Sequence, residues 1–129
     1  MIARLRGKVT LVVPGEALVD TGPVTYRVWM RSDLDTVGVP GEPAYELIIR
    51  QVVKEDSHDL YGFQFEAEES IFLSITGIKG CGPRLAMKVL SGISTREFSE
   101  AVKTRDVKRL TSIKGVGAKT ALAIIEALQ

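Results

Sequence analysis

Two short Gly-x-Gly segments contain the residues of this sequence that are best suited to chemistry. The first runs from Ile78 to Ala86 as I-K-G-C-G-P-R-L-A, and the second from Ile113 to Ala121 as I-K-G-V-G-A-K-T-A, about 35 residues later. The glycines let the backbone turn sharply, adopt positive φ and approach a ligand without a Cβ in the way. Each pair precedes a helix start, where free N–H groups and the helix dipole attract anions. A cation one turn in, Arg84 or Lys119, makes phosphate the expected anion.

The duplicated segment has the pattern of a helix-hairpin-helix motif, which holds nucleic-acid backbone without reading base sequence. One Gly-x-Gly before a helix could be only a tight connection, but two copies with the same flanking Lys and Ala favour phosphate binding. Cys81, between two glycines, is at a position that suits a small apolar side chain better than a reactive thiol. The predicted DNA phosphate-binding residues are Lys79, Gly80, Cys81, Gly82, Arg84, Lys114, Gly115, Val116, Gly117 and Lys119.

A charged stretch, residues 54–59 with sequence K-E-D-S-H-D, could also do chemistry. Its Glu, Asp and His side chains are possible metal ligands. However, the chain has no second histidine, and metal sites need ligands that converge from several elements. Solvated charge at a hairpin tip is the simpler alternative.

The charged stretch lies in the first half of the chain, whose residue pattern predicts strands on both sides of it. Alternating apolar and polar residues between Gly/Pro turns predict five strands, and residues 31–39 could hold a short helical turn. Such a series suggests a small barrel of the oligonucleotide-binding (OB) type. Four aromatic side chains could stack on bases, as in many OB folds. Their alternating positions on the strands favour packing in the core or at an interface instead. They are Tyr26, Trp29, Tyr61 and Phe63. The expected strands cover residues 3–13, 17–20, 24–30, 45–53 and 60–63.

After residue 65 the apolar period becomes helical. Glu66, Glu68 and Glu69 open the first helix with acidic charge, which suits a helix N-terminus, and Ser94 with Glu97 forms a capping box. We therefore predict an α+β protein with a barrel domain over 1–65 and an all-α domain with both hairpins over 66–129. Phe72 and Ile75 repeat at helical spacing, and Val107 and Leu110 belong to a short helix before the second hairpin. The residues expected on buried helix faces are Phe98, Val102, Ile124, Ile125 and Leu128.

Charge divides unevenly along this chain of 129 residues, whose formal net charge is only +1. Residues 1–65 contain seven Lys and Arg against nine Asp and Glu, whereas residues 66–129 contain ten against seven. Starting the second part at Ser70 leaves ten against four. The basic second part is therefore the one expected to contact phosphate.

Several function classes are disfavoured by what the sequence lacks. No apolar run approaches the roughly 18 residues of a membrane span, and the first residues do not resemble a signal peptide. The single cysteine excludes an internal disulfide and fits the cytoplasm. There is neither a G-x-x-x-x-G-K-[ST] phosphate loop nor a Ser-His-Asp or Cys-His set beyond the lone His58. We therefore expect a non-catalytic protein without cofactor, metal site or membrane contact.

Four motifs together resemble the RuvA family of bacterial Holliday-junction-binding proteins, over essentially the whole chain. They are M-I-x-R-L-R-G, E-D-x-x-x-L-Y-G-F, G-C-G-P-R-L-A-M-K-V-L-S-G and I-K-G-V-G-A-K-T-A. The resemblance implies a homotetramer, or two tetramers face to face, that opens four-way DNA junctions for branch migration or resolution in recombination and repair. Glu55 and Asp56 match the family's acidic pin. Their charges, gathered at the junction centre, would repel phosphate and keep strands apart.

The chain departs from the family at two positions and at its end. Ala118 and Ala123 stand where basic side chains are usual, which should weaken binding and its salt dependence. With the sequence ending at Gln129, we expect the third domain, which in the family contacts the RuvB motor ATPase, to be missing. We therefore expect junction binding without stimulation of such a motor. The alternative function is a self-sufficient junction binder that presents DNA to another partner, such as a resolvase.

Overall fold

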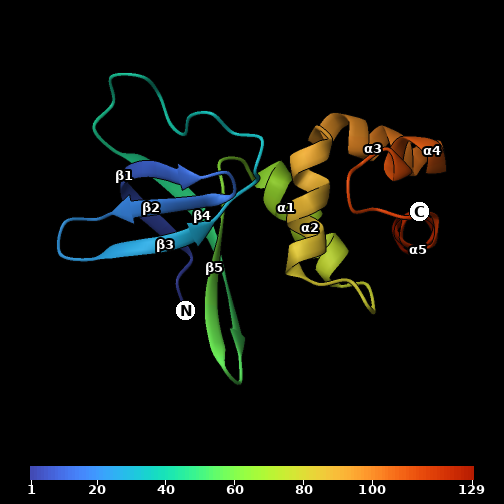
Figure 1. The fold of residues 1–129 in the computed structure, drawn as a ribbon, viewed down its shortest axis with the longest axis horizontal. Helices are drawn as coiled ribbons and strands as arrows, with labels where there is room; N and C mark the ends of the chain where they lie inside the picture. Colours follow the sequence, from blue (N-terminus) through green and yellow to red (C-terminus); the bar gives the residue numbers. More distant parts are fainter. The chain divides into compact units, whose positions relative to one another are not determined.

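A computed structural model describes all residues, 1–129, as two compact units, Met1–Glu69 and Ser70–Gln129 (Figure 1). The predicted α+β class, a five-stranded barrel followed by helices, is confirmed. The units divide inside the first helix, a few residues after the boundary expected at residue 65. The strands are β1 (Arg4–Val13), β2 (Glu16–Asp20), β3 (Thr25–Trp29), β4 (Tyr45–Lys54) and β5 (Ser57–Phe63). The helices are α1 (Glu66–Thr76), α2 (Pro83–Gly92), α3 (Thr95–Lys103), α4 (Val107–Thr111) and α5 (Ala118–Leu128).

The first unit is built on a closed barrel with strand order β1-β2-β3-β5-β4. All pairings are antiparallel except that of β3 with β5, through Trp29 and Tyr61, which closes the barrel. Inward side chains alternate along the strands as period-two patterning requires. They form one apolar core, whose buried members are Leu5, Ala17, Val19, Val28, Met30, Leu47, Ile49 and Leu60.

The β4–β5 hairpin is longer than the sequence pattern suggests. Lys54 pairs with Ser57, so only Glu55 and Asp56 remain in the turn. The expected long charged tip over 54–59 is therefore wrong, because backbone pairing continues through exposed polar residues whatever their charge. The helical turn suggested for residues 31–39 is absent as well. That segment forms turns and bends, and Gly38 has a φ of 91°, which no right-handed helix includes.

The acidic first turn of α1 does more than complement the helix dipole. The Glu68 side chain is 2% exposed and accepts the N–H groups of Gln64 (3.0 Å) and Phe65 (3.2 Å). It also pairs with Arg31 at 2.8 Å. Hydrogen bonding to Asp33 first, and then to Glu68, raises the pKa of the Arg31 guanidinium above its ordinary value. These contacts tie the start of α1 to the barrel, which explains why the first unit extends to Glu69.

The second unit packs its helices around side chains expected from the helical period. Ile75, Leu110, Ile124 and Ile125 are fully buried, and Phe72, Phe98 and Val102 are nearly so. Leu128 was expected on a buried face, but it is only half-buried because it lies in the last turn of α5. The capping box at the start of α3 is confirmed.

Candidate nucleic-acid interface

The two Gly-x-Gly loops have the same backbone geometry. In each, the amide of the middle residue, Cys81 or Val116, donates to the carbonyl of the isoleucine that opens the motif, at 3.0 and 3.1 Å. The first glycine of each pair has positive φ, 87° at Gly80 and 93° at Gly115. A four-residue turn with positive φ at its third position is a type II turn, which favours glycine there. The sequence duplication is therefore also a structural one.

The second glycine of each pair has a different role from the one expected. Gly82 and Gly117 have φ of −109° and −90°, so the positive φ expected of the Gly-x-Gly segments occurs only at the first glycine of each pair. They are the N-cap residues of α2 and α5, and an N-cap residue has extended backbone that many side chains adopt. A Cβ added to either would meet no atom within 4 Å. What these glycines provide is bare backbone beside open space.

The N-termini of α2 and α5 lack a side-chain cap. No side chain accepts a hydrogen bond at Gly82 or Gly117. The first N–H groups of any α-helix have no partner within the helix. At α2 one of these donors is missing, because Pro83 has no N–H. Both helix starts therefore present donors, and the positive end of the dipole, to an external anion.

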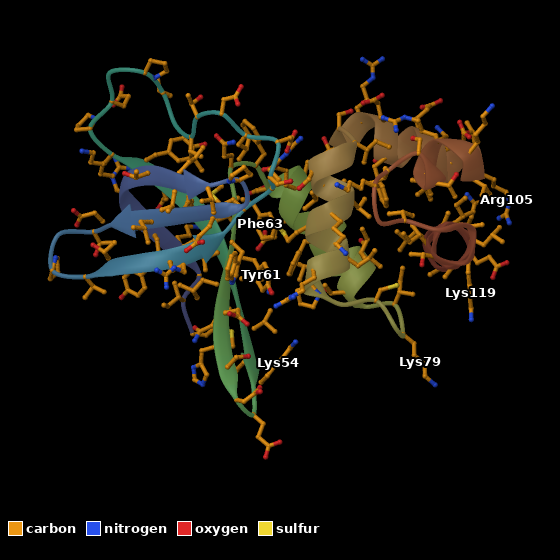
Figure 2. The ribbon with its side chains drawn as sticks, viewed as in Figure 1. Lys54, Tyr61, Phe63, Lys79, Arg105 and Lys119 are labelled. Atoms are coloured by element: carbon orange, nitrogen blue, oxygen red, sulfur yellow. The ribbon has the colours of Figure 1, made fainter.

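Cations surround both hairpins. Lys79, Arg84, Lys114 and Lys119 are exposed, and none of them forms an ion pair. Figure 2 shows Lys79 and Lys119 extending away from the helices of their unit into open space. The unit from Ser70 to Gln129 contains ten Lys and Arg against four Asp and Glu. This arrangement can bind phosphate through N–H donors and positive charge.

The middle residues of the two hairpins use their amides inside the turn. Cys81 is half-buried and Val116 is 5% exposed. Their N–H groups already donate to Ile78 and Ile113. Phosphate binding at Cys81 and Val116 stays a prediction.

Lys88, which the sequence pattern did not single out, also lies at the second hairpin. The position that a Cβ on Gly115 would take is 3.0 Å from Cδ of Lys88 and 3.6 Å from its Nζ. The duplication contains a signal for this residue, because the repeat distance that relates the two hairpins places Lys88 opposite Ala123. The two repeats therefore differ by one cation on the helix that follows the hairpin.

The acidic tip consists of Glu55 and Asp56 alone. Both are exposed and neither forms an ion pair. Figure 1 shows the β4–β5 hairpin projecting beyond the rest of its barrel. His58 and Asp59 lie on β5 instead, and Asp59 accepts a hydrogen bond from the Trp29 indole at 3.4 Å. No group of three or more His, Cys, Asp or Glu in residues 1–129 is arranged to hold a metal ion.

The barrel aromatics are mainly packing residues. Tyr61 and Phe63, both labelled in Figure 2, are 6% and 2% exposed, so neither ring is accessible for base stacking. Trp29 is 37% exposed and its indole is held by Asp59.

Among the helices, none has the length and apolar character needed to cross a bilayer.

Comparison with known proteins agrees with this geometry in both units. Residues 1–62 match the family model for the RuvA N terminal domain, and residues 72–129 match that for the SAM-like helix-hairpin-helix tandem. A relative from Anaeromyxobacter sp. (strain Fw109-5) is 41% identical over 130 residues, which cover 100% of this chain and 66% of the relative. Relatives from Myxococcus xanthus (strain DK1622) and Chlorobium limicola (strain DSM 245 / NBRC 103803 / 6330) are each 40% identical over 126 residues, which cover 97% of this chain and 62% of each relative. All three are named Holliday junction branch migration complex subunit RuvA. The chain thus spans slightly less than two thirds of their length.

Proposed function

Because this chain belongs to the RuvA family, we propose that it binds four-way DNA junctions through their phosphate backbone, without reading base sequence. The observation that carries the proposal is the pair of hairpins with matching turns, each followed by an uncapped helix N-terminus and flanked by unpaired cations. Backbone amides and flexible lysines recognise phosphate oxygens but do not distinguish the bases.

Each hairpin would hold one stretch of DNA backbone. Phosphate oxygens would accept hydrogen bonds from the N–H groups at the starts of α2 and α5, while Arg84 and Lys119, in the first turn of each helix, neutralise their charge. The open space beside Gly82 and Gly117 lets the backbone approach without steric conflict. Because each neutralised phosphate releases counterions, the logarithm of affinity should fall with the logarithm of salt by about 0.9 per contact.

The proposed working unit is a homotetramer around the junction, so that every arm meets hairpins from the subunits beside it. In this proposal the chain is a non-catalytic subunit. The ATPase of branch migration belongs to a separate RuvB-type motor, the partner that the family resemblance implies. This role fits the name that the relatives carry, a branch migration complex subunit.

Glu55 and Asp56 would act as an acidic pin at the centre of the assembly. Their position in the turn of a projecting hairpin leaves both carboxylates in solvent and free of cation partners. Two carboxylates from each subunit would gather negative charge at one point. Phosphate would be repelled there, so the strands at the crossover would be kept apart and available for exchange.

A gel-shift titration tests the main proposal. A synthetic four-way junction and a linear duplex with the same arm sequences are titrated with the chain at one salt concentration. We expect much tighter binding to the junction, and the same junction affinity when the arm sequences are shuffled. Equal affinity for junction and duplex would contradict the proposal.

A double variant, Glu55→Gln with Asp56→Asn, tests the pin separately. Removing the charges removes repulsion, so junction affinity should be kept or raised, and the preference for junction over duplex should decrease. A metal role makes the opposite prediction. In that case the variant would lose affinity, and chelation would weaken wild-type binding until a divalent cation was added back.

A further inference from the structure

One face of α2 lies against the second hairpin. Lys88 and Gly92 are four residues apart on α2 and therefore share a helix face. A Cβ on Gly92 would approach Cγ2 of Ile113 to 2.7 Å, so the end of α2 packs closely on the residue that opens the second hairpin. One turn earlier, the Lys88 side chain extends over Gly115. The helix of the first motif thus contributes to the surface of the second.

Gly115 is suited to this contact in two ways. Its φ of 93° is one that residues with a Cβ rarely adopt. In addition, a Cβ would stand only 3.0 Å from the Lys88 methylene Cδ, which is closer than such atoms normally approach. The missing side chain therefore leaves a place for the Lys88 stem along the turn.

The ammonium group of Lys88 has no partner of its own. The residue is exposed, and it forms neither an ion pair nor a hydrogen bond within the chain. Its Nζ lies 3.6 Å from the Cβ position of Gly115, two residues before Gly117, the N-cap of α5. That helix starts with Ala118, which contributes no charge. A cation from α2 thus lies at the turn that leads into the start of α5.

We propose that Lys88 is a phosphate-binding residue of the second hairpin, supplied by the helix of the first. The inference rests on the proposed function, because it assumes that this hairpin holds DNA backbone. A phosphate at the start of α5 then meets cations from both motifs, Lys119 from its own helix and Lys88 from α2. Binding at the second hairpin therefore depends on the packing of the two motifs against each other.

The first hairpin has no such reinforcement. Gly80 is the counterpart of Gly115, and a Cβ placed there would meet no atom within 4 Å, so no side chain covers it. The counterpart of Lys88 is Ala123, whose side chain cannot reach outward or bind an anion. The two phosphate sites are accordingly unequal, and the second one holds its phosphate more strongly.

A purely structural role for Lys88 makes different predictions. Lysine stems often cover apolar or bare backbone surface while the ammonium stays in water. In that case the methylene groups matter for stability and the charge does not matter for DNA. The variant Lys88→Met separates the two roles because it keeps an unbranched side chain over Gly115 and removes only the charge.

The experiment compares four proteins: wild type, Lys88→Met, Lys88→Arg and the control Lys103→Met. Lys103 is an exposed lysine in the last turn of α3, so its replacement removes the same charge from the same unit away from the hairpins. Junction affinity is measured by titration between 50 and 200 mM salt, and thermal unfolding is followed in parallel. We expect Lys88→Met to lower the salt slope by about 0.9, the value of one phosphate contact, with unchanged melting. Lys88→Arg and Lys103→Met should keep the wild-type slope.

Two results would overturn the inference. Lys88→Met could bind with wild-type affinity and slope, or Lys103→Met could lower the slope as much as Lys88→Met does. The variant Lys119→Gln serves as a reference, because it should weaken binding through the helix start alone. If Lys119→Gln weakens binding and Lys88→Met does not, the role of Lys88 is wrong while the proposed function stands. If wild type itself shows no preference for the junction, the proposed function fails and the inference fails with it.

Discussion

The helices of the Ser70–Gln129 unit begin in two different ways. At α3 the Ser94 side chain accepts a hydrogen bond from the backbone N–H of Glu97, and at α4 the Asp106 side chain accepts one from the backbone N–H of Arg109. At α2 and α5 the N-cap is a glycine, and no side chain serves the free amides. A side-chain cap contributes about 1 kcal/mol of stability relative to alanine, but only a few tenths of a kcal/mol relative to glycine. At the two helix starts that are flanked by unpaired cations, glycine therefore leaves the amides free at little cost in stability, which supports the proposal that these starts bind phosphate.

The largest expected effect comes from giving the uncapped helices caps of their own. In Gly82→Asp and Gly117→Asp, a carboxylate would accept the free amides and occupy the place proposed for phosphate. Junction affinity should fall on the order of a hundredfold, because charge-assisted hydrogen bonds are lost and repulsion is added. Melting temperature should stay constant or rise. Retained affinity with a raised melting temperature would show that these helix starts do not touch DNA.

A smaller effect separates the two glycines within one hairpin. Gly115→Ala should destabilise the fold by about 1–2 kcal/mol, because alanine is strained at a φ of 93°. Gly117→Ala has extended backbone and open space, so urea unfolding should be nearly unchanged while junction affinity decreases. Comparing unfolding and gel-shift titrations of both variants checks this. Equal stability losses would mean that the second glycine is also needed for the turn.

The capped helices should respond in the reverse manner. Ser94→Ala removes the acceptor for the Glu97 amide, so the free energy of unfolding should decrease by about 1 kcal/mol. Junction affinity should remain that of wild type, because this helix start is already satisfied within the chain. Denaturant unfolding and a gel-shift titration of the same preparation are the measurements. A marked loss of DNA binding would remove the distinction between capped and uncapped starts.

The smallest effect concerns the pH dependence of the same cap. Hydrogen bonding to Ser94, followed by that from Arg109, lowers the pKa of Glu97 below its ordinary value of 4.5. A lowered folded-state pKa means that the stabilisation is present above pH 4.5 and is lost as pH falls through the folded-state value. Glu97→Gln should therefore lose less stability than wild type when pH falls from 6 to 3. Because the carboxylate is exposed, the difference should be small. If the free energy of unfolding fell equally with pH in wild type and in Glu97→Gln, the Glu97 carboxylate would not be the source of this pH dependence.

Most of the architecture could be predicted from local pattern. Period-two alternation located the strands because each barrel strand has one face in the core. The helical period located Phe72, Leu110 and Ile124 for the same reason. The capping box was readable because Ser94 and Glu97 interact within a single turn. The hairpins were readable because a type II turn favours glycine at its third position.

What the sequence determined by itself were features encoded by neighbours along the chain: strand and helix type, the capping box at Ser94, the paired hairpins and their cations. Only the tertiary structure decided which glycine of each pair has positive φ and how far the β4–β5 ladder extends. It also revealed that Glu68 is buried against Arg31 and that Lys88 lies over Gly115. The physical reason differs between them: the turn and the ladder depend on backbone hydrogen bonds that residue types alone do not fix. The Arg31–Glu68 and Lys88–Gly115 contacts depend on residues brought together by packing from distant positions, and no local period or motif encodes such a contact. The sequence showed that the second half of the chain is basic, but only the structure showed that some of its lysines and arginines lie near the starts of α2 and α5.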